Sequence, residues 1–581
     1  MSENQEELPQ ELPETQPEKK SKRGWLIGGC ALLGVLVIAA VVLFVIFDPF
    51  GLVALIFGGG EIAAIVPDDA AVYAEMDLLA FQSEDLQEII EAFQDAAAEV
   101  EEEPETYEDS LEESLGVTME DISPWIGQHI GLVIADLDFD MVNGDETIPM
   151  VVIVQSRDKE EADAFIETVL DHREDEFDED FDDFEFDSAV FYEKDDEYDP
   201  MIFGRYKSFV FFANDMDALE DVLDLVQEGR RAKHTLADLD EYQQTIKSLA
   251  DNALVTAFLS SDAVSEYSEA MGEDLSAGIP TFSAFSDIEE AGGLTISVVE
   301  AGIQLQFATI YIEPDELPWI DLDMDMSGLT MQSAGMLPEE TVLYICGYYP
   351  EDWAELYFEN FSEDELEAFE LLEDEFDVDF EDLFTSIEGE VALAVFEQDE
   401  GFISEIAEMP LGLSILIGIN DDSEWNQLFD QLTDLAGSDL MMETDEVDLD
   451  DLELISLSLD DGHDQYPFLI YGTGDSFAVL STEVENAEIL IGEEDTLADS
   501  SDFQEVWASF PEDAYPFMYL DLQSFIQLFA DASSGMLLGS VDEEEESEVN
   551  ILEPLTAVAA TSTYYDLSDR QIITIIFFID R

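Results

Sequence analysis

The stretch MEDISPWIGQHIGLVIADLD at residues 119–138 returns in weaker form as DFEDLFTSIEGEVALAVFEQD at residues 379–399. In both, acidic residues typical of a short helix lead into an apolar run of strand length, so each predicts a helix-to-strand junction. Aligned on each other, the two stretches share a Glu-Asp pair and an isoleucine at the start of the apolar run. One match of this kind proves little, so the rest of the chain decides whether it belongs to a repeat.

Four further pairs of segments match in the same order along the chain, which indicates an internal duplication. The pairs are VPDDAAVYAEMDL with LPEETVLYICGYY, VVIVQSRDKEEADAF with ILIGINDDSEWNQLF, KSFVFFANDMD with DSFAVLSTEVE, and TLADLDEYQQTIKSL with TLADSSDFQEVWASF. All partners are separated by between 261 and 271 residues. We therefore expect two homologous copies, at residues 65–333 and 334–581.

Each copy is predicted to be an α+β domain with a mostly antiparallel sheet, because its strands are joined by short turns and its helices lie between hairpins. In the first copy we expect strands at 72–76, 130–137, 149–155 and 253–259, hairpins of 189–192 with 209–213 and of 294–299 with 304–312, and helices at 83–99, 159–170 and 216–226. The second copy should end in a hairpin of 561–566 with 571–579. Trp125 is expected in the core.

The charge of the chain is extreme. It has 581 residues, of which 144 are Asp or Glu and 16 are Lys or Arg, giving a formal net charge of −128. Such a surface repels nucleic acid and anionic lipid headgroups, so we expect no nucleic-acid partner. It attracts cations or a basic envelope protein, and it suits saline surroundings in which salt screens self-repulsion. An apolar content of 47% is ample for packed cores.

Residues 24–47, GWLIGGCALLGVLVIAAVVLFVIF, contain no charge. As a helix this segment would rise about 36 Å, enough to cross a hydrocarbon layer of about 30 Å. The basic residues KKSKR precede it, so by the positive-inside rule residues 1–23 stay in the cytoplasm and the bulk of the chain is exported. A cleaved signal peptide would be shorter, and a lipoprotein box at Cys30 would end the apolar run rather than begin it. We expect a single-pass cell-membrane protein with a linker at 48–64.

Catalytic patterns are scarce. The sequence around Ser476, GDSFA, approximates a nucleophile elbow, but such an elbow needs a helix after the serine, and a strand is expected here. We therefore interpret Ser476 as part of a hairpin turn. His129 and His463 are the nearest candidate bases, and the second copy has Glu390 at the place of His129. The four histidines show no zinc-binding spacing, so no catalytic residue or cofactor is assigned.

The acidic runs suggest cation binding. Aspartates alternate with apolar residues in DLDFDMVNGDE, and eleven carboxylates crowd DHREDEFDEDFDDFEFD. A calcium loop of EF-hand type needs a glycine at its sixth position and a glutamate at its twelfth, where the first run has Met141 and Thr147. Alternation of this kind is also typical of a half-buried strand. The candidates for diffuse, weak binding of cations such as calcium are Asp136, Asp138, Asp140, Asp178, Asp180 and Asp182.

The order of the anchor and the segments PDDAAVYAEMDL, EDISPWIGQHIGLVIAD, VVIVQSRDKEEADAF and TLADLDEY resembles the bacterial domain-of-unknown-function family 3352. The resemblance covers nearly all of the exported part. It implies a membrane-anchored bacterial envelope protein with no assigned activity, and it supplies no catalytic residue to carry over.

These observations lead to one functional hypothesis and two alternatives. The hypothesis is a non-enzymatic binding or scaffolding module of the cell envelope with an acidic, salt-adapted surface and an unknown ligand. The first alternative is a carrier of hydrophobic ligands or lipids, because antiparallel sheets with helices on one face enclose apolar cavities. The second is an extracytoplasmic hydrolase that uses Ser476.

Overall fold

The computed structural model divides the chain into two units, Met1–Pro49 and Phe50–Arg581. The described residues all belong to the second unit. They are 62–97, 115–136, 148–177, 179–194, 200–250, 253–265, 290–311, 331–349, 378–398, 411–438, 442–449, 452–460, 465–474, 476–482, 489–490, 496–511, 514–528, 554–565 and 570–580. The predicted anchor at 24–47 lies outside them, and none of the helices they form is long and apolar enough to cross a membrane.

The described residues in the first half of this unit form ten strands. They are β1 Val72–Asp77, β2 Ile126–Ile134, β3 Met150–Ser156, β4 Asp182–Phe186, β5 Ala189–Lys194, β6 Met201–Tyr206, β7 Phe209–Ala213, β8 Val255–Leu259, β9 Glu290–Val299 and β10 Gly302–Tyr311. Its helices include η1 Ile62–Ile65, α2 Glu84–Ala97, α4 Met119–Ile122, α6 Lys159–Phe177, α7 Met216–Glu228, η3 Gly229–Arg231, η4 Leu236–Asp238 and α8 Asp240–Ser248.

The second half repeats this series of strands. They are β11 Thr341–Tyr349, β12 Ile387–Glu397, β13 Leu411–Ile419, β14 Glu443–Leu449, β15 Leu452–Asp460, β16 Gln465–Gly474, β17 Phe477–Ser481, β18 Tyr515–Asp521, β19 Leu555–Tyr565 and β20 Arg570–Ile579. Its helices include η8 Gln332–Met336, α12 Phe380–Thr385, α14 Ser423–Ser438, η10 Leu497–Asp499 and α15 Ser501–Ala508.

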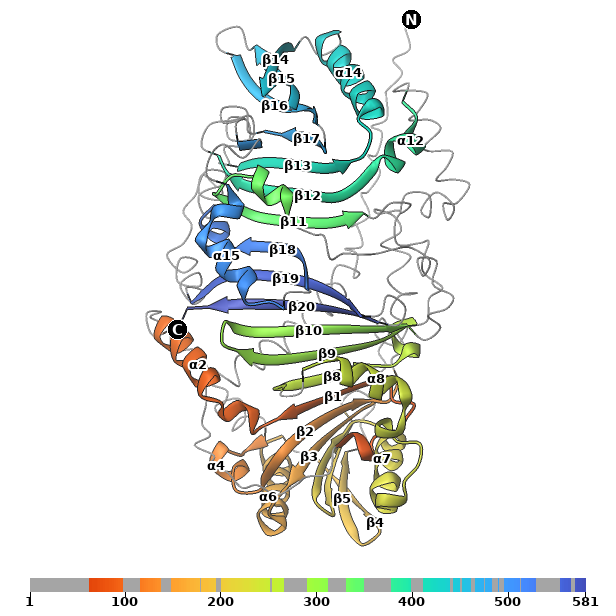
Figure 1. Cartoon of the computed structure of the whole chain (residues 1–581). Helices are drawn as coiled ribbons and strands as arrows, with labels where there is room; N and C mark the ends of the chain where they lie inside the picture. Colours follow the sequence, from red (N-terminus) through yellow and green to blue (C-terminus); the bar gives the residue numbers. More distant parts are fainter. Residues whose placement is uncertain are drawn as a thin grey trace, which may run out of the picture. The chain divides into compact units, whose positions relative to one another are not determined.

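All these strands belong to one antiparallel sheet (Figure 1). In the first half the order across the sheet is β4-β5-β6-β7-β3-β2-β1-β8-β9-β10. The second half has the same order, β14-β15-β16-β17-β13-β12-β11-β18-β19-β20. Strands β10 and β20 pair with each other, so the two halves share the sheet. The mixed α and β composition and the antiparallel sheet agree with the predicted class.

One predicted hairpin is wrong. Residues 189–192 do not pair with 209–213, because β5 pairs with β4 and β6, whereas β7 pairs with β6 and β3. The sequence prediction omitted β4, whose acidic residues hide the alternation of Phe184 and Phe186, and it omitted β6. Several boundaries also differ, and the clearest cases are that β2 begins at Ile126, α6 extends to Phe177 and β19 begins at Leu555.

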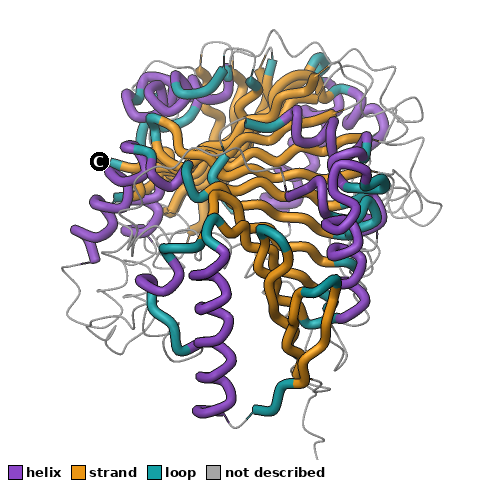
Figure 2. The backbone as a smooth tube through the Cα atoms, turned by 90° about the horizontal axis from the view of Figure 1, so that it is seen from below, coloured by secondary structure: helices purple, strands orange, loops and turns teal. Residues whose placement is uncertain are grey.

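Helices pack on both faces of the sheet (Figure 2). We call the face that carries Tyr73 and Tyr344 the tyrosine face. In the first half η1 and α7 pack on it, around Tyr73. Helix α6 packs on the opposite face, where Trp125 is only 2% exposed and its ring centroid lies 4.8 Å from that of Phe165. The expected core position of Trp125 is confirmed.

Candidate functional site

The predicted cation-binding aspartates fall partly outside the described residues, which include Asp136, Asp180 and Asp182 but not Asp138, Asp140 or Asp178. Asp182 lies in β4, directly opposite Glu193 of β5. Within the described part of the chain, no group of three or more His, Cys, Asp or Glu side chains is arranged to hold a metal ion. Weak cation binding stays a prediction.

Ser476 lies in the turn between β16 and β17, where its side chain is exposed and its carbonyl accepts a hydrogen bond from the Ile419 amide at 3.0 Å. A strand follows it, as the turn interpretation requires. Neither candidate base can be placed beside Ser476. His129 lies in β2 of the other half with its Nδ1 2.7 Å from Glu75 Oε1, and His463 is outside the described residues.

Glu390 and His129 occupy corresponding places in β12 and β2; Glu390 belongs to a buried polar group and His129 to a half-buried one. Glu390 is buried and accepts hydrogen bonds from the Gln332 amide at 3.0 Å, the Ser333 amide at 2.8 Å and the Ser333 hydroxyl at 2.8 Å. It therefore caps the N-terminus of η8, where backbone amides lack helical partners. In the first half the Tyr73 hydroxyl donates to Glu75. Burial, followed by the Glu75 carboxylate, raises the pKa of Tyr73 well above its usual value.

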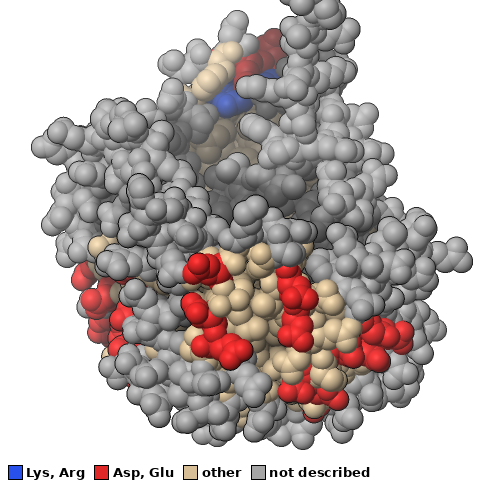
Figure 3. All heavy atoms as spheres, turned by 90° about the horizontal axis from the view of Figure 1, so that it is seen from above, with Lys and Arg blue, Asp and Glu red and all other residues tan. Residues whose placement is uncertain are grey.

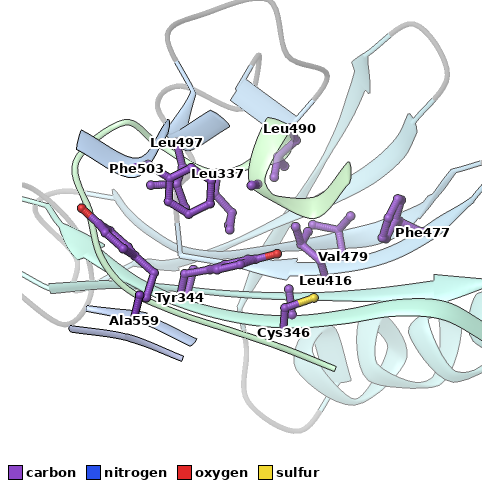
Figure 4. Close-up of a cluster of buried hydrophobic side chains, with 14 of the residues drawn as sticks. Leu337, Tyr344, Cys346, Leu416, Phe477, Val479, Leu490, Leu497, Phe503 and Ala559 are labelled. Carbon is purple, nitrogen blue, oxygen red and sulfur yellow. The ribbon is translucent and has the colours of Figure 1, made fainter. Parts of the chain in front are cut away.

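Cys346 lies in the corresponding cluster of the second half (Figure 4). Its Sγ is 3.8 Å from the Tyr515 hydroxyl, and burial raises the pKa of its thiol. Burial likewise raises the pKa of Tyr344 well above its usual value. A nucleophilic cysteine needs its thiolate form, which this surrounding disfavours. The buried surrounding of Cys346 is therefore unfavourable for a nucleophilic role of its thiol.

The junction between β10 and β20 is the most unusual region of the sheet. Across the sheet, Tyr73 pairs with Phe258, Phe258 with Gly293, and Gly293 with Ala308. In the second half Tyr344 pairs with Tyr519, Tyr519 with Ala559, and Ala559 with Ile576. Ala308 and Ile576 are thus equivalent positions. Because Ala308 pairs with Ile572 and Gln304 with Ile576, a pseudo-two-fold axis passes through the Gln306–Thr574 pair. The junction therefore resembles the isologous interface of a symmetric dimer.

Opposite the tyrosine face, the junction carries three apolar rows, each crossing β9, β10, β20 and β19. The rows are Val298-Ile303-Phe577-Val558, Ile296-Leu305-Ile575-Ala560 and Leu294-Phe307-Ile573-Ser562. Of these twelve side chains only the Ser562 hydroxyl is polar, and none is charged. Phe307 is 39% exposed, and Ile303, Ile573, Ile575 and Phe577 are half-buried. Five members of the rows are buried, namely Ile296, Leu305, Val558, Ala560 and Ser562. The accessible part is therefore formed by the other seven side chains, which are all apolar in a chain with 144 acidic residues.

On the tyrosine face the same strands carry a polar row, Thr295-Gln306-Thr574-Thr561. The Gln306 amide donates to the Thr574 hydroxyl at 3.3 Å. Thr295 and Thr561 are each 1% exposed, and within the described part of the chain their hydroxyls have no hydrogen-bond partner. The polar row is thus mostly buried among apolar neighbours such as Ala308 and Ile572, whereas Phe307 on the opposite face is exposed.

Sequence reasoning predicted both terminal hairpins but missed this site. The available signal was the alternation of Ile303, Leu305 and Phe307 with Gln304 and Gln306 in β10. In β20 the run QIITIIFFI is apolar on both sides, which is typical of a strand with both faces covered and hides the alternation.

Three comparisons with known proteins follow from the sequence and the fold. The model of the family DUF3352, described as a protein of unknown function, matches residues 26–578. No curated protein matches the sequence. A solved structure, "Structure of crystal form I of TP0453", is similar over 44% of this chain and 79% of its own, with 8% identity and a TM-score of 0.24, which is too low to support an argument.

Proposed function

This chain belongs to the DUF3352 family of proteins of unknown function, and we propose that it is a non-enzymatic binding protein of the bacterial cell envelope. In this proposal residues 24–47 anchor it in the cell membrane and the two halves lie outside. The three apolar rows at the junction bind a long apolar chain, such as the acyl chain of a lipid.

The uncharged apolar face carries this proposal. Its rows run side by side across four strands and leave Phe307 more than a third exposed. Burying apolar surface yields roughly 25 cal/mol per Å², so an acyl chain laid across these rows would be held without any ionic contact. Anchoring would place the protein beside a supply of such chains.

The state of the polar candidates supports a non-enzymatic role. Ser476 occupies a hairpin turn, Glu390 caps η8, and burial raises the pKa of the Cys346 thiol. Ser476 and Glu390 thus have structural roles, and burial disfavours the thiolate that Cys346 would need as a nucleophile.

Photo-crosslinking tests the ligand class. Cells that express the full chain are fed a fatty acid carrying a diazirine, irradiated, and the labelled peptides of the protein are mapped. We expect label on peptides containing β10 and β20, and also on residues 24–47, where the proposed anchor meets lipid. Phe307→Glu should remove the label from the junction, because a charge desolvated by an acyl chain is costly.

Phe384→Glu is the matched control, since Phe384 in α12 is 37% exposed and lies outside the junction. It should leave the labelling pattern unchanged. Label confined to residues 24–47 would overturn the apolar-ligand proposal and favour a scaffolding role for the same envelope protein.

A further inference from the structure

The segment GRRAKHT, residues 229–235, is a basic stretch in an acidic protein. It holds three of the twelve Lys and Arg residues that follow Arg23, and between Lys247 and Arg570 there is neither Lys nor Arg. It follows α7 and contains η3. We call residues 229–234 the basic loop.

Two cations of the basic loop are not held by described carboxylates, a state that they share with Lys159. Arg231 and Lys233 are exposed, and neither forms an ion pair with any described residue. By contrast, Arg173 and Lys194 both pair with Glu179, at 2.6 and 2.9 Å. Two unpaired cations so close together are unexpected where acids outnumber bases ninefold.

The loop lies where the chain enters the folded unit. The Asp68 amide donates to the His234 carbonyl at 3.1 Å, and the Leu236 amide donates to the Val66 carbonyl at 2.8 Å. Pro67 and Thr235 form a β-bridge between these bonds. Residues 48–61 separate the predicted anchor from Ile62, the first described residue, and fourteen residues span at most about 50 Å when extended. A membrane that holds the anchor is therefore within reach of the loop.

The second copy reverses the charge at this place. Its bridge joins Pro338 to Thr496, and the residues before Thr496 are GEED where the first copy has RAKH. Lys233 and His234 thus correspond to Glu494 and Asp495. The copy that follows the predicted anchor carries the basic loop, and the copy that does not follow an anchor carries acids.

We propose that the basic loop docks on anionic lipid headgroups of the membrane that holds the anchor, with Arg231 and Lys233 as the contacts. The inference rests on the anchoring proposed above. The net charge of −128 argues against anionic lipid as a partner of the whole surface. However, screening over about 8 Å at physiological salt separates the loop from most of that charge. His234, 84% exposed with its Nδ1 3.2 Å from Asp68 Oδ2, flanks the contact.

Hydrogen–deuterium exchange on the full chain in lipid nanodiscs tests the docking. We compare discs of phosphatidylcholine alone with discs that also contain phosphatidylglycerol. Amides of residues 229–235 should exchange more slowly in the anionic discs, and high salt should abolish the difference. Each cation at an anionic surface favours the docked state roughly fivefold, so R231E/K233E should lose the protection entirely.

Lys159→Glu is the control, because Lys159 is an exposed cation at the start of α6, on the opposite face of the sheet from α7. It should retain the protection. Equal exchange of residues 229–235 in both kinds of disc, or protection that survives in R231E/K233E, would overturn the docking. If alkaline carbonate extracts the chain from membranes, both the anchoring and the docking are overturned. Crosslinking of a fatty acid at the junction tests the ligand and does not depend on either.

Discussion

At the scale of single residues, one buried hydroxyl group in or beside the junction is hydrogen-bonded and another lacks a partner within the described part of the chain. Thr245 in α8 and Thr561 in β19 are both almost fully buried. The Thr245 hydroxyl donates to the Glu241 carbonyl at 2.8 Å, whereas the Thr561 hydroxyl has no partner among the described residues. A buried hydroxyl without a partner costs about 1–3 kcal/mol of desolvation, so the two residues should respond oppositely to loss of the oxygen.

We predict that Thr561→Val stabilises the protein by about 1 kcal/mol, because valine keeps the shape and removes the unpaired hydroxyl. Thr245→Val should destabilise it by a similar amount, since it removes a formed hydrogen bond. The midpoint of thermal unfolding, followed by tryptophan fluorescence, measures both changes. A lower midpoint for Thr561→Val would contradict this prediction and would mean that the Thr561 hydroxyl forms a hydrogen bond in solution.

At the scale of elements, α8 lies so close to β9 that one position admits only glycine. A Cβ built on Gly293 would lie 2.2 Å from Thr245 Cγ2 and 3.0 Å from Leu249 Cδ1. The neighbouring Gly292 points to the other face, where its Cβ would meet Leu259 Cβ at an ordinary 3.6 Å. Gly293 therefore allows the close approach of α8 to the sheet, whereas Gly292 faces away from α8.

Gly293→Ala should therefore destabilise the fold by about 1–3 kcal/mol by forcing α8 away from the sheet. Gly292→Ala, one residue away, should change the unfolding midpoint little. The same thermal measurement compares them. If both variants unfold at the midpoint of the parent chain, α8 does not pack on β9 as described.

The strands at the two outer ends of the sheet, β4 and β14, carry exposed acidic residues that hinder the pairing of a further strand. The exposed residues of β4 include Asp182, Asp183 and Glu185, and those of β14 include Glu443 and Asp445. Acidic side chains are visible on the β14 side of the molecule in Figure 3. Charged edge strands repel further strands, whereas β10 and β20, whose one charged residue is Arg570, pair with each other.

At the scale of the whole molecule, the two halves depend on each other through that shared edge. Each half alone would expose β10 or β20 as an unpaired apolar edge, which is a template for aggregation. The pseudo-symmetric register at Gln306 and Thr574 is what a gene duplication that fused the two subunits of a dimer would leave. The proposed binding surface is formed by strands of both halves.

The net charge should make the stability of the whole protein depend strongly on salt. We predict that the thermal midpoint rises by several degrees from low to molar NaCl, because counterions screen the repulsion among 144 acidic groups. Calcium chloride at matched ionic strength should add only a gradual, non-saturating increment. A calcium effect that saturates would instead reveal a discrete site, with Asp136, Asp180 and Asp182 as the first described residues to replace.

Much of the architecture could be predicted because its signals are local or repeated. The helix-to-strand stretch at 119–138, the antiparallel class and the family were read correctly from patterns. The predicted hairpin of β5 with β7 failed because β6, which lies between them in the sheet, was not predicted. Aspartates could be proposed from the sequence as cation ligands, but carboxylates that are close in sequence need not meet at one point in space.

The sequence by itself determined the duplication, the alternation that assigns side chains to the two faces of each strand, and the acidic surface. These are properties of neighbouring residues and of repeated order. Only the tertiary structure decided that β10 pairs with β20, that apolar rows meet there, and that the basic loop adjoins the entry of the chain. The physical reason is that alternation specifies which face a side chain occupies, whereas the neighbour of a strand depends on how segments far apart in the chain fold back together.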